Sequence, residues 1–345
     1  MKIAFIGDTH YGIRGDSSLF LNHFLKFFEE RFFPYIKKHN ITEVIHLGDL
    51  FDRRKFVNFH TLHHVNKRFI NWFEENGVNL HCILGNHDVF YKNTNRLNSP
   101  KEIIDSCNKT FHLYERPTEL CLGGLTLLMV PWINEENKNN FLDIIENTKA
   151  PVLVGHLELT GYEVMAGVNF GEGMDDKFLQ KFDMVLSGHF HKKSSKESVH
   201  YLGTQYQMTT ADINETKGFH TLDTETRELV FIENPSKIFH NVEWRNGTVI
   251  QNFDPANYKG TFVKILVYEK KNEIRFDKFI DDLYAAEPAN ISIVEDLSDR
   301  QQDPSEIDVT EDTLTLINKE IDSMETDSKE ELKNIVREIY MESLD

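Results

Sequence analysis

Short hydrophobic runs that end in a polar, metal-ligand type of residue recur through the first 191 residues of the chain. Five such runs occupy residues 3–6, 44–47, 80–84, 152–154 and 184–186, and each leads through a Gly into Asp, Asn or His. A continuous hydrophobic run of this length is typical of a strand buried on both faces of a parallel or mixed sheet. Functional groups collect beyond the carboxyl ends of such strands. We therefore expect the polar residues after these runs to meet in one site.

Helical periodicity predicts two long helices between the early strands. Phenylalanines at 20, 24, 27, 28 and 32 follow Asp16-Ser17-Ser18, a candidate N-cap, and Pro34 is expected to kink or end this helix. We interpret the Phe stripe as core. A second helix is predicted from about residue 61 to 76, with Gly77 as its stop. Short alternating segments between about 199 and 232 predict antiparallel strands, so the expected fold class is α/β (α+β) with two sheet layers.

The pattern divides the chain into four parts. Residues 1–249 form the main domain, and residues 250–297 are predicted to form a small α/β module with a strand, a helix and a strand. Residues 298–309 are polar and acidic with a Pro, which indicates a linker. Residues 310–345 carry two short amphipathic helices, which either fold back on the body or bind a partner.

Charge and cysteine content refine this picture. The formal net charge is −18, but residues 296–345 hold 16 Asp/Glu and 5 Lys/Arg, so the tail carries −11 of it. A negative net charge disfavours nonspecific nucleic-acid binding. Bound divalent cations or a basic partner change the local electrostatic potential, so the net charge alone does not exclude a nucleic-acid substrate. Three cysteines without a CxxC spacing fit a reducing compartment. No long apolar segment or signal peptide is evident, so we expect a soluble, cytoplasmic protein with no membrane partner.

The residues at the strand ends are those of a metal site without thiolates. They are Asp8, His10, Asp49, Asn86, His156, His189 and His191. Mixed Asp, Asn and His ligation suits Mn²⁺, Mg²⁺, Fe or Zn²⁺. These side chains are too many for one ion with open positions, and they fit two ions ~3.5–4 Å apart with a bridging carboxylate. The predicted chemistry is phosphoester hydrolysis.

Five motifs together resemble the calcineurin-like metallophosphoesterase superfamily. They are Gly7-Asp8-Thr9-His10, Gly48-Asp49-Leu50-Phe51-Asp52, Gly85-Asn86-His87-Asp88, Gly155-His156 and Gly188-His189-Phe190-His191. The resemblance implies a sandwich of two mixed sheets flanked by helices. It also implies that Asp8, His10, Asp49 and His191 hold one ion, and that Asp49, Asn86, His156 and His189 hold the other. His87 would protonate or steady the leaving oxygen, and Asp88 would orient His87.

Residues outside these motifs narrow the resemblance to SbcD-type DNA repair nucleases, and among them to the recombination endonuclease subunits of T-even-type bacteriophages. They are Met129-Val130-Pro131-Trp132-Ile133, Tyr201-Leu202-Gly203-Thr204 and Lys217-Gly218-Phe219. This resemblance implies an exonuclease and endonuclease acting on DNA in double-strand-break processing and recombination, with Mn²⁺ as the preferred metal and Mg²⁺ as the alternative. It implies an SbcC-type SMC-like ATPase bound to the capping module and C-terminal helices, and a homodimer formed through the region 57–76. Some family members have His at the position of Asp52. We therefore assign Asp52 no catalytic role from the sequence.

Several interpretations stay open at this point. Arg53, Arg54 and Lys192 lie next to the motifs and either contact substrate phosphates or belong to solvated loops. His46 and His81 are expected in the core, and His60, His63 and His64 at the surface or a subunit interface. A phosphatase of the same superfamily is the main alternative function. A third is a scaffold that regulates a partner ATPase.

Overall fold

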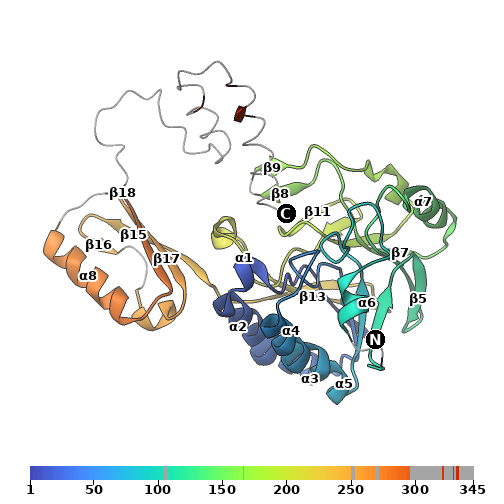
Figure 1. Cartoon of the computed structure of the whole chain (residues 1–345), viewed down its shortest axis with the longest axis horizontal. Coiled ribbons are helices and arrows are strands. Elements are labelled where there is room, and N and C mark those ends of the chain that lie inside the picture. Colours follow the sequence, from blue (N-terminus) through green and yellow to red (C-terminus); the bar gives the residue numbers. More distant parts are fainter. Residues whose placement is uncertain are drawn as a thin grey trace.

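The computed structural model of the chain describes residues 1–104, 107–165, 167–249, 253–268 and 272–295, together with residues 321, 329, 332 and 333. A large body contains two sheets and most of the helices, and a smaller module extends from one side of it (Figure 1). The predicted linker at 298–309 and most of the predicted C-terminal helices lie outside the described residues.

The first sheet has six strands in the order β14-β13-β1-β2-β3-β4. Strands β1 to β4 are parallel, and β13 and β14 add antiparallel strands at the other side. The bounds are β1 Lys2–Ile6, β2 Glu43–His46, β3 Asn79–Ile83, β4 Phe111–Tyr114, β13 Gly218–Asp223 and β14 Leu229–Glu233.

The second sheet also has six strands, in the order β11-β12-β10-β7-β6-β5. Strands β12, β10, β7 and β6 are parallel, while β11 and β5 are antiparallel edge strands. The bounds are β5 Thr118–Leu122, β6 Leu125–Val130, β7 Val152–His156, β10 Met184–Gly188, β11 Ser194–Lys196 and β12 Val199–Tyr201; a separate pair consists of β8 Glu163–Met165 and β9 Val168–Asn169. The prediction of two mixed sheets is confirmed.

Alternate side chains of the strands point into different cores. Ile3 and Phe5 of β1 pack with Val152 and Val154 of β7 in the core between the two sheets. Ala4 and Ile6 face the other way, into a core shared with the phenylalanine-rich helices. A third core lies on the outer face of the second sheet, under α7. Because both faces of each sheet are covered, the central strands are continuous hydrophobic runs.

The helices of the first layer follow the predicted segments. The first run is α1 Ile13–Asp16, α2 Ser18–Phe27, the π-helical η1 Phe28–Phe32 and α3 Phe33–Lys38; the second is α4 Phe59–Val65, the π-helical η2 Asn66–Ile70 and α5 Asn71–Asn76. Gly77 ends the second run at φ 63°, as predicted. Pro34 does not end the first run: it lies at the start of α3, directly after the π-helical turn η1, and Phe33 before it keeps helical φ and ψ. All five phenylalanines of the stripe are buried.

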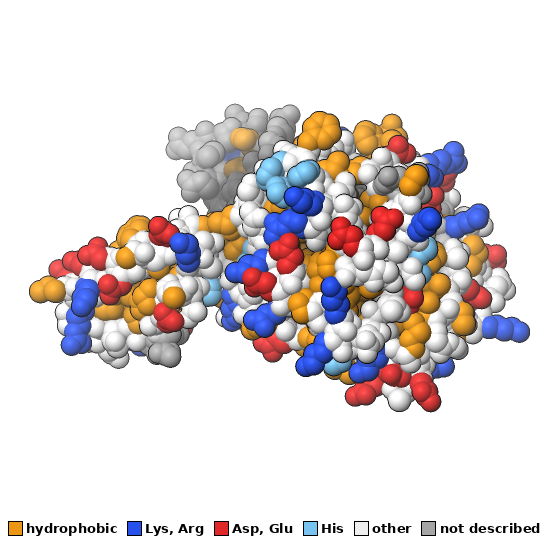
Figure 2. All heavy atoms as spheres, turned by 90° about the horizontal axis from the view of Figure 1, so that it is seen from below, with side chains coloured by type: hydrophobic (Ala, Val, Ile, Leu, Met, Phe, Trp, Pro, Cys, Tyr) orange, Lys and Arg blue, Asp and Glu red, His pale blue; other side chains and the backbone are white. Residues whose placement is uncertain are grey.

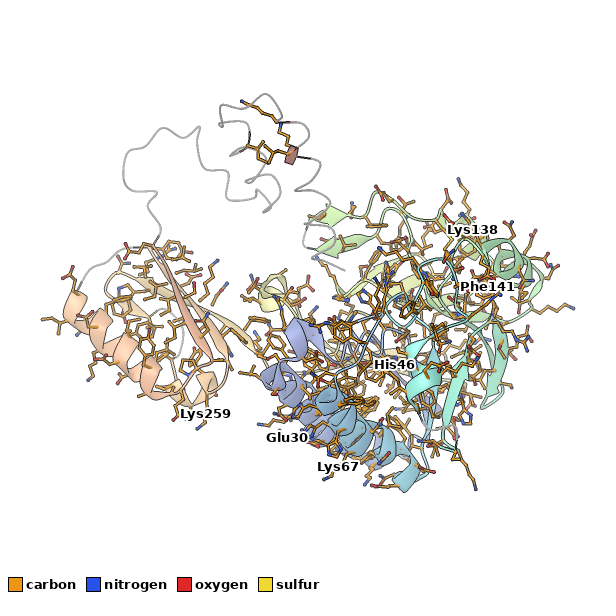
Figure 3. The ribbon with its side chains drawn as sticks, viewed as in Figure 1. Glu30, His46, Lys67, Lys138, Phe141 and Lys259 are labelled. Atoms are coloured by element: carbon orange, nitrogen blue, oxygen red, sulfur yellow. The ribbon has the colours of Figure 1, made fainter. Side chains whose placement is uncertain are left out.

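The remaining helices are short apart from two. Their bounds are α6 Ser99–Ile103, α7 Lys138–Asn147, η3 Asp176–Leu179, η4 Thr210–Asn214, η5 Pro255–Tyr258 and α8 Glu273–Ala285. Figure 3 shows His46 inside the body, and it shows Glu30 and Lys67 on the helices of the first layer. Among the described residues, no helix is both long and apolar enough to cross a membrane.

The small module begins before the predicted boundary at residue 250. Its sheet has the order β16-β15-β17-β18, with β15 Phe239–Arg245, β16 Thr248–Val249, β17 Phe262–Val267 and β18 Asn290–Glu295. The boundary prediction is corrected because β15 pairs with β17 in parallel and not with the main sheets. Trp244 packs against Phe276 and Phe279 of α8 to form the module's core. Phe239 and Phe262 meet Phe20 of α2 at ring distances of 5.8 and 5.6 Å, which joins the module to the body.

Candidate active site

The five motifs lie at the carboxyl ends of β1, β2, β3, β7 and β10. The first three strands are parallel neighbours in one sheet, and β7 and β10 are parallel neighbours in the other. The ends of both sets meet, since His156 Nδ1 lies 2.7 Å from the Leu47 carbonyl. The predicted convergence of the motif residues is therefore observed in the structure.

Glycines allow the motif loops to approach one another. A Cβ added to Gly85 would lie 2.1 Å from Asp49 Oδ1, and one added to Gly48 would lie 2.6 Å from the Gly85 nitrogen. Four predicted ligands sit in the left-handed region, with φ of 49° for Asp8, 43° for His10, 56° for Asp49 and 89° for His189. Non-glycine residues adopt this region at a cost, which the surrounding structure must offset. The chain therefore carries local strain where it aims these side chains inward.

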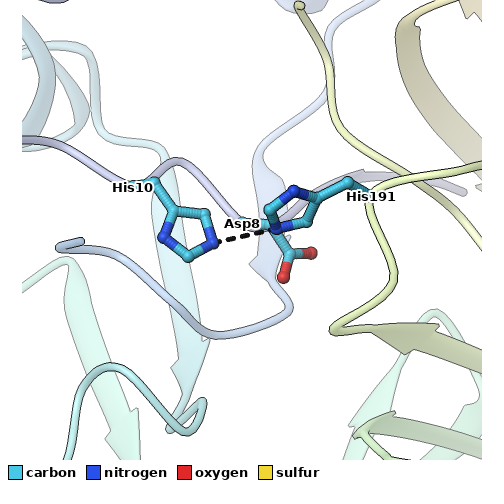
Figure 4. Close-up of side chains that lie close together, drawn as sticks. All are labelled: Asp8, His10 and His191. Atoms are coloured by element: carbon cyan, nitrogen blue, oxygen red, sulfur yellow. Dashed lines mark hydrogen bonds between the residues drawn. The ribbon is translucent and has the colours of Figure 1, made fainter. Parts of the chain in front are cut away.

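The first group of candidate ligands contains Asp8, His10 and His191 (Figure 4). The Nε2 atoms of the two histidines lie 3.1 Å apart. Asp8 Oδ1 accepts a hydrogen bond of 3.0 Å from the His189 backbone, while its Oδ2 is buried with no hydrogen-bond partner among the described residues. A buried carboxylate oxygen without a partner is costly unless a cation balances it. These atoms fit a divalent metal.

The second group contains Asp49, His156 and His189, with Asn86 beside them. Asn86 Oδ1 lies 2.9 Å from His156 Nε2 and 2.9 Å from His189 Nδ1. His156 Nδ1 donates its proton to the Leu47 carbonyl, so Nε2 is the nitrogen that offers a lone pair to a metal once the ring is neutral. The oxygen and two nitrogens that face one another form a second donor set for a metal.

Asp49 belongs to both groups. Its Oδ2 lies 3.6 Å from His10 Nε2 and 3.4 Å from His156 Nε2. Its Oδ1 accepts a hydrogen bond of 2.8 Å from the backbone of His87. This central place is the one that a bridging carboxylate requires.

His87 lies next to the first group and forms a third cluster of candidate ligand atoms with His10 and Asp49. Its ring centroid is 4.8 Å from that of His10. Its Nδ1 donates to the Asp52 carbonyl at 2.5 Å, so Nε2 is the ring atom left for a substrate. The side chain of Asp52 is close as well, with Oδ1 3.3 Å from His10 Nδ1. Asp52, which the sequence left without a role, thus supports both histidines.

The structure corrects the role predicted for Asp88. Its carboxylate accepts hydrogen bonds from the backbone N–H groups of Asp49, Leu50 and Gly85, at 2.8, 2.9 and 2.8 Å. Asp88 therefore ties two motif loops together, and the Asp52 carbonyl orients the His87 ring. A short buried carboxylate is better satisfied by three backbone donors than by one ring nitrogen.

Several other residues hold the candidate ligands or their neighbours in place, and the sequence did not predict this role for them. Glu158 faces the outer nitrogen of His189, with Oε1 to Nε2 at 3.4 Å. The buried Lys217 Nζ donates to the His191 carbonyl at 2.8 Å and pairs with Asp212. His46 is buried as predicted, and its Nε2 is 3.0 Å from the Thr9 hydroxyl. Partners of this kind hold ligand rings in place, but their positions along the chain carry no local signal.

Burial and mutual charge shift the pKa values of the site. Burial raises the pKa of Asp8 to about 6 and that of Asp88 to about 7. Burial would lower the pKa of His10, but Asp52 and Asp49 raise it to about 9. Burial would also lower the pKa of His156, which Asp49 raises to about 9. Protons thus occupy the metal-free site at neutral pH and must leave when a metal binds.

Metal affinity is therefore expected to increase with pH. Ligands bind metal only when deprotonated, so protons compete with the metal. For each ligand that must lose a proton, the apparent metal affinity should rise roughly tenfold per pH unit as long as the pH is below the pKa of that ligand. His10 and His156 lose protons as pH rises toward about 9, and Asp8 above about 6. Calorimetric Mn²⁺ titration between pH 6 and 8, in two buffers of different ionisation heat, should show proton release. An affinity that does not change over this range would contradict the assigned ligands.

The three cations predicted to contact substrate differ in their surroundings. Arg53 donates to Asp16 at 3.1 Å, and its guanidinium lies over the Phe56 ring. Lys192 Nζ is 2.8 Å from Glu163 Oε1. The Nε and Nη1 atoms of Arg54 are buried and have no hydrogen-bond partner in the described part of the chain. Arg54 is therefore the best placed of the three to accept a ligand.

A comparison of the sequence with protein families gives the same class of protein as the fold and the site. The model of the calcineurin-like phosphoesterases matches residues 1–193, and the chain belongs to this family. The prediction of a metal-dependent phosphoesterase is thereby confirmed.

Relatives narrow the comparison further. The chain is 30% identical to Exonuclease subunit 1 of Enterobacteria phage T4, over 99% of both chains. It is 22% identical to the SbcD component of the SbcCD nuclease of Staphylococcus saprophyticus, over 80% of this chain and 77% of the relative. These are the kinds of protein that the sequence motifs indicated. A solved archaeal phosphodiesterase is 16% identical, covers 68% of this chain and 100% of its own, and superposes with a TM-score of 0.34, which is too weak to carry an argument.

Proposed function

We propose that this protein is a two-metal DNA nuclease with exonuclease and endonuclease activity. The observation that carries the proposal is the placement of Asp49 Oδ2 between His10 and His156, which belong to different groups of candidate ligands. The nuclease names of its relatives support a nucleic-acid substrate, which in this proposal is DNA. The wider role would be double-strand-break processing and recombination in the host cytoplasm.

The ligands divide between two divalent ions. Asp8, His10, Asp49 and His191 would hold one, and Asp49, Asn86, His156 and His189 the other. Oxygen and imidazole donors without thiolate suit Mn²⁺, and Mg²⁺ as an alternative. When bound, such a pair polarises the phosphodiester and activates water.

The protein's own groups complete the chemistry. His87 Nε2 would donate a proton to the oxygen that leaves the phosphorus. This step requires the doubly protonated ring, because the Nδ1 proton is held by the Asp52 carbonyl. Burial lowers the pKa of His87, and the charge of Asp49 and the Asp52 carbonyl oppose that shift. Asp88 would keep the Asp49 and Gly85 loops at a fixed spacing. Glu158 and Lys217 would hold His189 and the His191 backbone in place.

The proposed assembly includes a homodimer and an ATPase. Phe59 exposes 87% of its surface at the start of the 57–76 region. On α4, His60 and His64 have ring centroids 4.6 Å apart, and Figure 2 shows histidines gathered beside Lys and Arg on the face that carries this helix. A second copy would cover this surface. An SbcC-type SMC-like ATPase would bind the capping module and the C-terminal helices.

A direct comparison of substrates tests the proposal. With Mn²⁺, the protein is expected to cleave linear DNA at least about 100-fold more efficiently than it hydrolyses a phosphopeptide, since kcat/KM reports discrimination in the transition state. The assay should be run with and without the ATPase. Faster phosphopeptide turnover would favour a phosphatase, and stimulation of the ATPase without any DNA cleavage would favour a scaffold.

A further inference from the structure

A small pocket lies between the loop after Asp52 and the loop after Asp88. It has a volume of about 190 Å³, and Arg54, Lys55, Phe56, Phe90 and Ser99 are among the residues that line it. The Ser99 nitrogen donates to the Asp88 carbonyl at 2.8 Å, and the Phe90 nitrogen donates to the Leu97 carbonyl at 2.9 Å. The two loops that form the pocket are therefore the same two that carry Asp52 and His87.

Two side chains in this pocket have buried hydrogen-bonding atoms that no described residue satisfies. The Nε and Nη1 atoms of Arg54 are buried and unpaired, and so is the Ser99 hydroxyl oxygen. Buried donors that have lost water without gaining an acceptor cost free energy. A charged acceptor with several oxygens would satisfy both residues at once.

The local charge favours an anion. Arg54 and Lys55 bring two positive charges to the lining and Glu102 one negative charge. Arg53, the next cation along the chain, is already neutralised by Asp16 at 3.1 Å. Arg54 thus differs from its neighbour in having its charge available.

Aromatic rings flank the cations. Phe56 lines the pocket and exposes 59% of its surface, and Tyr91 beside Phe90 exposes 55%. Exposed aromatic rings next to cations are typical of surfaces on which single-stranded nucleic acid stacks its bases.

We propose that this pocket is a phosphate-binding subsite for a single-stranded segment of the DNA substrate, one that holds a phosphate other than the one being cleaved. This inference rests on the proposed nuclease function. Arg54 and Ser99 bind the phosphate oxygens, and Phe56 stacks on a neighbouring base. Because the pocket shares its loops with His87, a strand held there is positioned relative to the active site.

Binding without catalysis is the first test. In EDTA, fluorescence anisotropy of a labelled single-stranded oligothymidylate should show roughly tenfold weaker binding for Arg54→Gln, because a charge-assisted contact is lost. Ser99→Ala should weaken binding a few-fold. Arg31→Gln, which removes an exposed arginine from η1, is the matched control and should bind like wild type. Unchanged binding in both pocket variants would overturn the proposal and leave the pocket to ordered water.

Catalysis gives the second test. Arg54→Gln should lower kcat/KM on single-stranded DNA about tenfold more than on bis(p-nitrophenyl) phosphate, mainly through KM. Equal losses on both substrates would mean a structural role and would overturn the subsite. If Arg54→Gln does not fold, Arg54→Lys and Ser99→Ala answer the same question.

The source of the phosphate is distinguished by competition. Unlabelled oligothymidylate is expected to displace the labelled strand. Inorganic phosphate is expected to displace it at least about 100-fold more weakly. Equal displacement by inorganic phosphate would overturn a subsite for DNA. Wild-type protein that binds the strand through Arg54 and cleaves no DNA would refute the proposed function and not the pocket.

Discussion

Asp49→Ala is expected to abolish DNA cleavage, with a loss of kcat/KM of at least about 10⁴-fold, or roughly 5 kcal/mol. The reason is that Asp49 is the carboxylate, among the described residues, that reaches both histidine groups, at 3.6 Å from His10 and 3.4 Å from His156. Both ions would lose a ligand, while each of the other proposed ligands serves one. Metal content per protein should be measured together with cleavage.

The matched control is Asp143→Ala, which removes an exposed carboxylate from α7. It should retain wild-type cleavage and metal content. Asp49→Ala protein that still bound two equivalents of Mn²⁺ with unchanged affinity would refute the shared ligand.

His87→Ala should lower cleavage of DNA by about 10²–10⁴-fold while the metals stay bound, because its ring is expected to donate a proton and not to hold an ion. The same variant should lose far less on bis(p-nitrophenyl) phosphate, since p-nitrophenolate leaves without protonation. A purely structural role would lower both activities alike. This dependence on the leaving group separates the two explanations.

The control for this variant is His39→Ala, an exposed histidine after α3. It should change neither activity. Full DNA cleavage by His87→Ala would eliminate His87 as the proton donor, and loss of bound metal would reassign it as a ligand.

The main features of the site could be predicted because they are encoded locally. A strand buried on both faces must be continuously hydrophobic, so the runs that precede Asp8, Asp49 and His189 are visible in the sequence. Parallel strands of this kind bring their ends to one edge. The spacing of Asp8 and His10, and of His189 and His191, then limits the ligands to a few residues.

Other features depend on residues that are distant in the sequence. Glu158 supports His189 from 31 positions away, and Asp52 reaches both His10 and His87. The role of Asp88 follows from which backbone N–H groups the folded loops present to it. Strand β15 has the pattern of an ordinary strand, and only its pairing with β17 assigns it to the small module. No local pattern distinguishes Arg54 from Arg53, because the two differ through a distant residue: Asp16 forms an ion pair with Arg53.

The two donor sets draw on both sheets, and this arrangement has a consequence for folding. His10 and His191, whose Nε2 atoms are 3.1 Å apart, are separated by 181 positions along the chain. The site can form only after the two sheets have packed against each other through the core that contains Phe5 and Val154. Metal ions that bind only this packed state stabilise it by mass action. The ions would act as a clamp across the interface of the sheets, and neither half of the chain alone could hold a complete set of ligands.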